Sequence, residues 1–504
     1  MMKTLLSVLT LFAIIATSQA KRLEVLFLGD NGHHKPSERV PQIMQGLGPK
    51  GVNFTYTSDP NCLHDGTLKS YDALMIYANI GNITQEQEKG ILDYVYKGGA
   101  FLPIHCASYC FLNSMQYIKL VGAQFKSHGA GTFTTEIKAP EHPIMKGFKG
   151  FETWDEAGED LNVSLAGYPE EEDWILYGPF SDKSLIRNVL IFQLSNAIGM
   201  YGSRTDFYEL TINDKFLGTY VLMEKIKRDK NRVNISKNLD DDISGGYIIK
   251  IDKPPDEGYT SANSFSSKFD TRGSYVGASD IKFLYTYPKS SEISNDQKNY
   301  IKNYINDFEE ALLSSNFQDP EIGYQKYIDI DSFVDFLILN EISKNIDAYR
   351  ISTFMHKDKN QKLKMGPIWD FNLGFGNVNY CDAELESGWS YKFNDVCGGD
   401  NWKVPFWWNR LFEDPAFVSK LKNRWSDLRT NILSDQNLQD RIDEITNFLI
   451  EHNAPRRNFD KWTIIGKYVW PNNYIGNNYG EEISYLKNWL EKRVKWMDEE
   501  INSI

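Results

Sequence analysis

The sequence has no excess of basic residues, which limits its choice of partners. Its 504 residues include 55 Lys and Arg against 68 Asp and Glu, for a formal net charge of −13. A protein that binds nucleic acid normally presents a basic face, so this balance argues against that class. Internal repeats and low-complexity tracts are also absent, and 41% of the residues are hydrophobic. This composition is typical of folded globular domains.

Cysteine and histidine are scarce, with five Cys and eight His. No Cys-x-x-Cys pair or Cys/His spacing typical of a zinc site is present. The odd number of cysteines leaves at least one thiol free. Cys381 and Cys397 flank a loop rich in Gly, Trp and Asn, and we predict that these two form a disulfide.

Long apolar runs are missing beyond the N-terminus, so the sequence predicts no membrane span. The first residues, Met1–Lys3, form a short basic stretch, and an apolar run follows over Thr4–Ala16. Ser18 and Ala20 place small residues where a signal peptidase reads. This pattern predicts a signal peptide over residues 1–20 and an exported protein. A membrane anchor is the alternative, but it needs about 20 apolar residues, more than this run provides.

Strand and helix patterns alternate over the next part of the chain. Apolar runs at residues 23–28, 52–57, 73–77 and 100–105 predict strands, and Thr84 predicts the N-cap of a helix over residues 85–96. Such alternation is typical of a parallel α/β sheet that binds ligands at the carboxyl ends of its strands. The residues expected at that edge are Asp30, Asn31, His33, His34 and His105.

From about residue 162 the pattern becomes α+β. It predicts antiparallel strands over residues 206–213, 216–225 and 246–253, and a long Gly/Ser-rich loop over residues 254–280. Helices are predicted over residues 296–314 and 331–346, followed by a hairpin of residues 350–356 against 362–368. The tail, residues 405–504, is helical and rich in Trp. We therefore predict a β-rich small lobe followed by a larger helical lobe.

Two acidic motifs stand out in the helical part. Asp347 lies in Asn345–Arg350 at the end of a predicted helix, and Asp370 lies in Trp369–Asn372 at the end of a predicted strand. The hairpin between the motifs brings its two ends together, so the carboxylates are predicted to converge. In phosphoryl transfer one carboxylate orients or deprotonates the attacking hydroxyl, and a second carboxylate with an Asn holds magnesium. Structural capping of the two elements is the alternative.

The chain over about residues 162–497 resembles the CotH family of secretory kinases. Besides the two acidic motifs, the resemblance is carried by residues 171–177, 181–188, 218–227, 245–252 and 404–411. It implies an atypical ATP-dependent kinase fold that uses Mg²⁺ or Mn²⁺, with Asp347 as the catalytic acid and Asp370 as the metal-binding acid. The opening strands of the family, with their Arg-Gly-Asn-Ser-Thr-Trp type motif, have no counterpart here. Those strands belong to the lobe over the nucleotide, so catalytic competence stays open.

Further residues are candidates for contacts with nucleotide or metal. Arg187 follows a predicted cap at Asp182 in an otherwise apolar helix, and we expect it to point into the cleft. Glu224 and Lys225 end a predicted strand and either form an ion pair of the kinase kind or lie in a solvated charged turn. The cofactor-binding candidates are Arg187, Glu224, Lys225, Arg350, Asn372 and Asn377. Other candidates in the same motifs and charge runs are Lys183, Lys227, Arg228 and Tyr349.

Residues 23–156 resemble a second family, the ThuA-like or trehalose utilisation family. The resemblance is carried by residues 27–34, 71–74, 103–108, 122–129, 142–148 and 151–156. It implies a flavodoxin- or amidotransferase-like α/β fold and a link to sugar utilisation. The implied pocket candidates are His33, His34, His105, His128 and Glu152. We predict a truncated ThuA-like domain over residues 21–156, a junction over 157–161, and a CotH kinase-like domain without its first strands over 162–504.

Three functions are compatible with these patterns. The first is an exported protein kinase that transfers the γ-phosphate of ATP to Ser or Thr of exported or surface proteins. The second is a non-catalytic surface or coat protein, that is, a pseudokinase. The third is a sugar-related function of the ThuA-like half, which would take a carbohydrate ligand.

Overall fold

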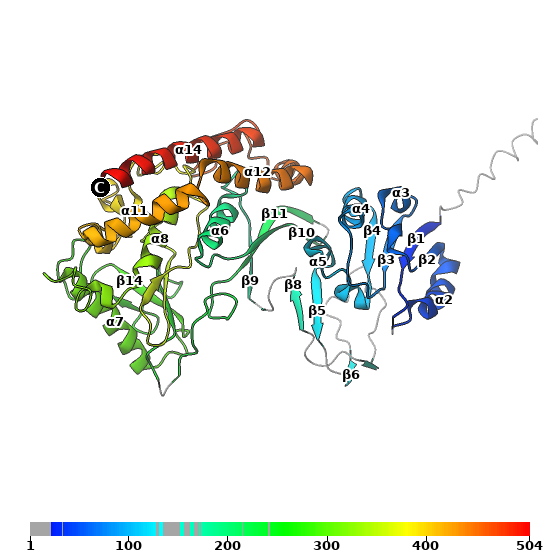
Figure 1. The fold of residues 1–504 in the computed structure, drawn as a ribbon, viewed down its shortest axis with the longest axis horizontal. Helices are drawn as coiled ribbons and strands as arrows, with labels where there is room; N and C mark the ends of the chain where they lie inside the picture. Colours follow the sequence, from blue (N-terminus) through cyan, green and yellow to red (C-terminus); the bar gives the residue numbers. More distant parts are fainter. Residues whose placement is uncertain are drawn as a thin grey trace, which may run out of the picture. The chain divides into compact units, whose positions relative to one another are not determined.

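The computed structural model describes residues 22–32, 34–127, 131–134, 152–155, 162–165, 171, 173–213, 215–239 and 242–504. The chain forms two compact units, Met1–Glu172 and Asp173–Ile504 (Figure 1). The predicted signal peptide, the predicted junction, His33 and His128 lie outside the described residues. Within the described ranges, no helix is long and apolar enough to cross a membrane.

The first unit is built on a four-stranded sheet in the order β2-β1-β3-β4. Its strands are β1 (Leu23–Leu28), β2 (Val52–Thr57), β3 (Ala73–Ile76) and β4 (Ala100–Pro103). All neighbouring pairs run parallel, with Leu23 opposite Val52 and Val25 opposite Ala73. The predicted parallel α/β architecture of this part is therefore confirmed.

Alternate residues of the central strands pack on opposite faces of this sheet, as the period of a β-strand requires. Leu26 and Leu74 pack with Ile91 of helix α4 (Gln85–Tyr96). Val25 and Phe27 pack on the other face with Val40 of helix α2 (Pro36–Leu47). The shorter helices are α3 (Asp65–Leu68) and α5 (Met115–Val121).

Helix α4 begins at the predicted cap. The Thr84 hydroxyl accepts a hydrogen bond from the Gln87 amide, and the Gln87 side chain accepts one from the Thr84 amide, which together form a capping box. Two antiparallel strand pairs complete the unit. They are β5 (Ala123–Ser127) with β8 (Asn162–Leu165), and β6 (Gly131–Thr134) with β7 (Glu152–Asp155).

The second unit contains two antiparallel sheets. The three-stranded sheet has the order β10-β11-β9, from β9 (Trp174–Tyr177), β10 (Thr205–Ile212) and β11 (Lys215–Glu224). The five-stranded sheet has the order β13-β14-β12-β15-β16. Its strands are β12 (Tyr247–Ile251), β13 (Ser264–Ser266), β14 (Lys282–Tyr287), β15 (Thr353–Lys357) and β16 (Leu363–Met365).

The predicted antiparallel strands over residues 206–213, 216–225 and 246–253 are present, but the third of them, β12, belongs to a different sheet from β10 and β11. The reason is the partner of β12, which pairs with β14 and with β15, about 100 residues later, instead of continuing the β10–β11 hairpin. The predicted hairpin over residues 350–368 is present as β15 and β16.

Helices form the remainder of the second unit. The long ones are α6 (Arg187–Ile198), α7 (Asn295–Leu313), α8 (Ile330–Ser343), α11 (Pro415–Thr430), α12 (Asp435–Glu451) and α14 (Tyr479–Ser503). The short ones are α9 (Phe393–Val396), α10 (Trp407–Leu411) and α13 (Ala454–Lys461). Helix α8 is buried over nearly its whole circumference and packs against α6, α11 and α14 (Figure 1). A helix that is apolar all round forms the core of a large domain.

Candidate functional site

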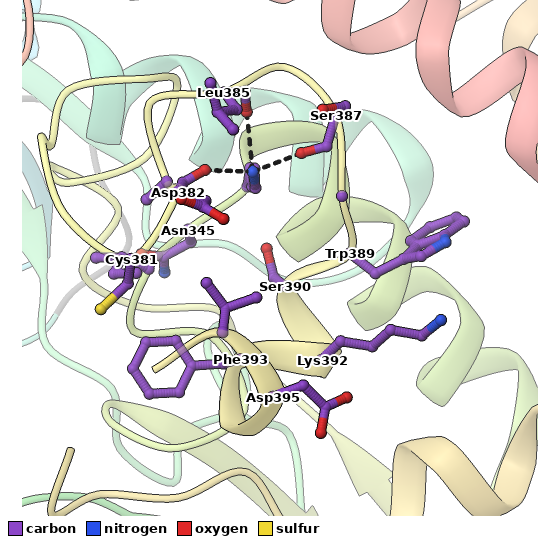
Figure 2. Close-up of a pocket in the computed structure, with 15 residues that line it drawn as sticks. Asn345, Cys381, Asp382, Leu385, Ser387, Trp389, Ser390, Lys392, Phe393 and Asp395 are labelled. Atoms are coloured by element: carbon purple, nitrogen blue, oxygen red, sulfur yellow. Dashed lines mark hydrogen bonds between the residues drawn. The ribbon is translucent and has the colours of Figure 1, made fainter. Parts of the chain in front are cut away.

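The end of helix α8 positions Asp347. The chain leaves the helix at Lys344, which has a left-handed backbone (φ 41°), and turns tightly through residues 346–350. The Asn345 side-chain oxygen accepts a hydrogen bond from the Asp347 amide at 3.2 Å. The buried ammonium of Lys344 donates to the carbonyls of Asp382, Leu385 and Ser387, which Figure 2 shows turned toward one nitrogen. Burial lowers the pKa of Lys344 to about 8.

The segment of Asp370 is held by contacts from helix α6 and from the turn after helix α8. The Phe371 amide donates to the Asn188 side chain of α6 at 2.6 Å, and the Asn345 amide group donates to the Asp370 carbonyl at 3.5 Å. Asn345 therefore contacts both acidic segments. Asp370 and Tyr349 have positive φ angles of 64° and 67°. A non-glycine residue in this region costs roughly 1–3 kcal/mol and is typical of functional sites.

Asp347 lies close enough to Asp370 to influence the ionisation of the Asp370 carboxylate. Burial, followed by the negative charges of Asp347 and Asp252, raises the pKa of Asp370 to about 6. Burial also raises the pKa of Asp347, and the positive charges of Arg350 and Lys253 oppose that rise. Among the described residues, none donates a hydrogen bond to the Asp370 carboxylate. The site therefore contains an acid with a raised pKa and free lone pairs.

Asp252 and Lys253 were missed by the sequence reasoning. They follow β12, and the pairing of Ile251 with Thr353 brings them to the segment that contains Asp347. Asp252 accepts a hydrogen bond from the Ser352 amide at 3.3 Å. The signal was present in part, because Asp252 and Asn188 each end a segment that carried the family resemblance. No local motif indicated that these segments meet the acidic pair.

Arg350 connects Asp347 to a loop that lies later in the chain. Its guanidinium is 2% exposed and donates to Asp347 Oδ1 at 3.0 Å and to Asp400 Oδ1 at 3.2 Å. Its Nε donates to the Ile346 carbonyl at 2.9 Å, and its Cζ lies 3.9 Å from the ring centroid of Phe393. Two carboxylates, a carbonyl and an aromatic face thus fix one planar group, which suits Arg better than Lys.

A disulfide closes that loop. Cys381 is bonded to Cys397, with 16 residues of sequence separation and a Cα–Cα distance of 5.5 Å. The Asp400 amide donates to the Cys397 carbonyl at 3.1 Å. The disulfide is therefore linked through Asp400 and Arg350 to Asp347.

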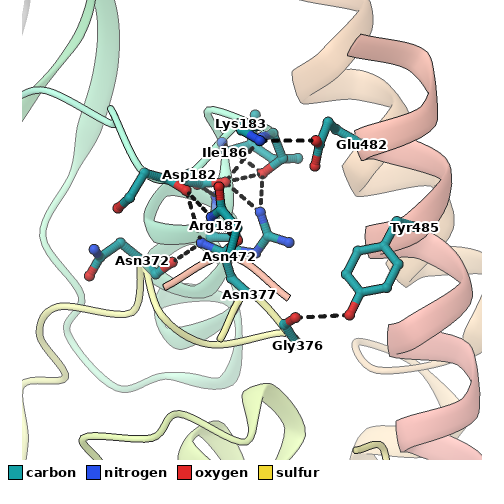
Figure 3. Close-up of polar contacts among 12 residues, drawn as sticks. Asp182, Lys183, Ile186, Arg187, Asn372, Gly376, Asn377, Asn472, Glu482 and Tyr485 are labelled. Carbon is teal, nitrogen blue, oxygen red and sulfur yellow. Dashed lines mark hydrogen bonds and ion pairs between the residues drawn. The ribbon is translucent and has the colours of Figure 1, made fainter. Parts of the chain in front are cut away.

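Arg187 is buried rather than directed into open space. Its guanidinium is 1% exposed and pairs with Asp182 at 2.5 Å, and its backbone amide donates to the other Asp182 oxygen at 2.9 Å (Figure 3). Lys183 is also buried and donates to the Lys467 carbonyl at 2.5 Å. Its ammonium lies 4.0 Å from Glu482 of α14.

Asn377 uses its side-chain amide to hold the loop after Asp370. It donates to the carbonyls of Ser181 and Asn372 at 3.2 and 2.8 Å, and its oxygen accepts from Asn472 at 3.0 Å (Figure 3). Asn372 lies in the same loop, and its carbonyl is one of these acceptors. Tyr349 is fully buried and donates its hydroxyl to Glu341 at 2.9 Å.

Glu224 and Lys225 do not pair with each other. The Glu224 side chain is completely buried and accepts a hydrogen bond from Arg204 Nε at 2.9 Å. It also forms an ion pair with Arg232, whose Nε lies 3.5 Å from the carboxylate. Lys225 is exposed and lies 3.5 Å from Asp173. Neighbouring residues at a strand end point to opposite faces, which explains the separate partners. Lys227 also pairs with Asp173, at 2.6 Å, and the Arg228 guanidinium lies 5.4 Å from the ring centroid of Tyr287.

The first unit brings two of its histidines together. The rings of His34 and His105 lie 4.6 Å apart, and Tyr77 is 5.9 Å from His105 (centroid distances), at the carboxyl ends of the parallel strands. Glu152 lies in β7. Burial raises the pKa of the Cys106 thiol to about 12, which disfavours a thiolate nucleophile there. The predicted strand ends at Pro103, so His105 and Cys106 lie in a short 3₁₀ turn, His105–Tyr109.

Metal ligands are not preassembled in the described ranges, where no cluster of three or more His, Cys, Asp and Glu side chains could hold an ion. Magnesium sites for phosphate chemistry use one or two carboxylates and complete the coordination with substrate phosphates and water. The Asp370 carboxylate, with Asp252 and Asp347 as neighbours, suits that kind of site.

The comparisons with known proteins identify the family. Residues 146–497 match the family model described as CotH kinase protein, and residues 24–160 match the one described as trehalose utilisation. The first match covers more than half of the chain. The chain therefore belongs to the CotH kinase family and carries a trehalose utilisation domain in its N-terminal part.

Two solved structures are similar to part of the chain. A protein from Bacteroides uniformis, described as ThuA-like, is 19% identical over 32% of this chain and 70% of that chain, with a TM-score of 0.26. Another from Parabacteroides merdae with the same description is 13% identical over 31% of this chain and 51% of that one, with a TM-score of 0.19. No curated protein matches the chain.

Proposed function

We propose that the second unit is an ATP-dependent protein kinase domain that transfers the γ-phosphate to Ser or Thr hydroxyls of exported proteins. The main support is the acidic pair. Asp370 offers a mostly buried carboxylate without a hydrogen-bond donor among the described residues, and burial, followed by the charges of neighbouring carboxylates, raises its pKa to about 6. Such an arrangement is common where a group must bind a cation or move a proton.

Asp347 is the base of the proposed reaction. Burial raises the pKa of its carboxyl group, which makes it a better proton acceptor for a hydroxyl. Arg350 binds only one of its oxygens, Oδ1, at 3.0 Å, which leaves Oδ2 for the substrate. Asp400 holds Arg350 in position, and Arg350 in turn orients Asp347.

Asp370 is the residue we assign to a divalent metal, Mg²⁺ or Mn²⁺, with Asp252 as its neighbour. When bound, such an ion neutralises phosphate charge and orients the transferred group. Lys253 is exposed at the same edge, and its positive charge reaches both acids. We assign it to the phosphates in place of Arg187 and Lys225, which have carboxylate partners in the fold.

The test is phosphate transfer by the purified full chain with ATP and Mg²⁺ or Mn²⁺. Asp347→Asn and Asp370→Asn preserve side-chain shape, and we expect each to reduce transfer by at least about 100-fold. Asp280→Asn, at an exposed position outside the site, is the matched control and should retain wild-type activity. Full metal-dependent turnover by either site variant would contradict the assignment.

A non-catalytic surface protein is the second candidate. It is favoured by the engagement of Arg187 with Asp182 and of Glu224 with Arg204, because these residues were expected to contact the nucleotide. Calorimetry with ATP and Mg²⁺ or Mn²⁺ separates the two functions. If no heat of ATP binding is measured while circular dichroism shows that the protein is folded, the result would favour the pseudokinase.

A sugar-related activity of the first unit is a separate proposal. The cluster of His34, Tyr77 and His105 at the carboxyl ends of the strands supports it, since parallel sheets bind ligands at this edge. A thermal-shift screen with saccharides would test the proposal. Any hit should be lost in His105→Ala, and an equal shift in that variant would exclude the cluster as the binding site.

Export through a signal peptide over residues 1–20 and a domain boundary over residues 157–161 are further proposals. The first rests on the basic and apolar pattern of the N-terminus. N-terminal sequencing of the exported protein would test it, with Lys21 expected as the first residue.

A further inference from the structure

A cavity of about 300 Å³ lies next to the end of helix α8 in the second unit (Figure 2). The apolar part of its lining comes from Ile346, Leu385, Trp389, Phe393 and Val396, and the charged residues Asp382, Lys392 and Asp395 line it as well. Most of the lining belongs to the loop that the disulfide closes. The cavity is therefore bounded on one side by the end of α8 and on the other by this loop.

The walls of the cavity are fixed by buried polar contacts. Lys344 gives one hydrogen bond to each of three loop carbonyls, so the loop is tied to the end of α8. In addition, the amides of Ser390 and Tyr391 donate to the Glu341 carboxylate of α8 at 2.8 and 3.0 Å. The cavity is thus preformed, and an occupant would not have to order the loop on binding.

The cavity adjoins the segment that carries the proposed base. Asn345 and Ile346 line it, and the next residue is Asp347. Consecutive Cα atoms are about 3.8 Å apart, so the wall begins one residue from the base. Phe393 contacts Arg350 and also lines the cavity, so it forms a wall shared with the group that holds Asp347.

We propose that this cavity receives a large apolar side chain of the polypeptide that is phosphorylated, close in sequence to the acceptor hydroxyl. The proposal rests on the proposed kinase function. The rim supports it, because Leu385 and Val396 are 43% and 49% exposed and extend the apolar surface outward. Lys344 has all three donors engaged by carbonyls, so its ammonium is not available to an acidic side chain.

The distance from the base limits the position of that side chain in the substrate. An extended peptide advances about 3.3 Å per residue, so the cavity is reached from the residues nearest the acceptor. One flanking position of the substrate should therefore dominate specificity. Removing several methylene groups from the substrate side chain at that position should lower kcat/KM by about tenfold or more.

The experiment uses the full chain and short peptides with one Ser on a Gly and Ala background. Leu is placed in turn at each position flanking the Ser, and kcat/KM for phosphate transfer is compared with that of the all-Ala peptide. We expect one position at which Leu raises kcat/KM about tenfold or more, mainly through KM. Val396→Asp should abolish that gain without changing kcat on the all-Ala peptide. Ile450→Asp, an exposed apolar residue of α12, is the matched control and should retain the gain.

The outcomes separate this proposal from the kinase function. Phosphate transfer with no preference for Leu at any position, or a preference that survives in Val396→Asp, overturns the cavity assignment while the kinase function stands. If no peptide is phosphorylated, the kinase function fails. Calorimetry with the same peptides, carrying Ala in place of Ser, then tests whether the cavity binds an apolar side chain. Tighter binding of one Leu peptide that is lost in Val396→Asp supports it, and equal binding of all peptides overturns it.

Discussion

Glu309 allows a quantitative test of the packing within the second unit. This residue of α7 is 1% exposed, and its carboxylate accepts hydrogen bonds from Trp407 Nε1 at 2.9 Å and from the Ser267 hydroxyl at 2.8 and 3.0 Å. It therefore joins α7 to α10 and to the end of β13. Burial raises the pKa of Glu309 from 4.5 to about 7, and these hydrogen bonds oppose the rise only in part.

The sign of the effect follows from that raised pKa. The folded state holds the proton more tightly than the unfolded state, so this contribution to stability is complete below pH 4.5 and is lost as the pH rises through about 7. One pKa unit corresponds to about 1.4 kcal/mol. Between pH 5 and pH 8, Glu309 should therefore lower the free energy of unfolding by about 2–3 kcal/mol.

Glu309→Gln removes the titration and keeps a carbonyl oxygen for the Trp407 N–H. We expect the stability of the variant relative to wild type to increase by about 2–3 kcal/mol between pH 5 and pH 8. The assay is urea unfolding of the full chain followed by tryptophan fluorescence, since all of the 12 tryptophans except Trp154 lie in the second unit. Glu310→Gln, at the exposed neighbouring position, is the control. Identical pH dependence in Glu309→Gln and wild type would refute the reasoning.

Three further predictions concern other contacts of the second unit. Glu341→Ala leaves the buried charge of Arg493 without its partner, and we expect urea unfolding to show that the free energy of unfolding falls by about 3–5 kcal/mol. A decrease of less than about 1 kcal/mol would contradict this prediction. Cys397→Ser opens the loop that the disulfide closes, and we expect the free energy of unfolding to fall by about 3 kcal/mol. The wild-type protein under reducing conditions should show the same decrease, and an unchanged unfolding midpoint in the variant would refute the prediction. Arg350→Lys cannot bind two carboxylates in the same plane, so phosphate transfer should fall more than about tenfold, and unchanged kcat would argue against orientation of Asp347 by this residue.

Local signals in the sequence predicted much of the fold. The capping box at Thr84 and the hairpin of β15 and β16 depend on residues that are close in the chain, and the strand segments of the first unit follow from their local apolar patterns. The convergence of Asp347 and Asp370 was inferred from the same hairpin. These features could be predicted because each is determined by short-range periodicity and turn chemistry.

The remaining features depend on contacts between distant segments. Asp252 reaches the site because β12 pairs with β15, and a strand pattern does not specify its partner. Arg187 could not be placed because the sequence does not show that Asp182 is folded back onto its guanidinium. The membership of β12 in a separate sheet could not be predicted either, because it depends on the same unspecified strand partner.

The ion pair of Glu341 and Arg493 has a consequence for the order in which the protein is made. The two residues are separated by 152 positions, and both are fully buried. Glu341 binds Tyr349, next to the acidic pair, and the amides of Ser390 and Tyr391 in the cavity wall. At about 5–20 residues per second, a ribosome needs roughly 8–30 s to extend the chain from one residue to the other. For most of that interval the nascent chain contains Asp347 and Asp370 but lacks the cation that pairs with the buried Glu341 carboxylate.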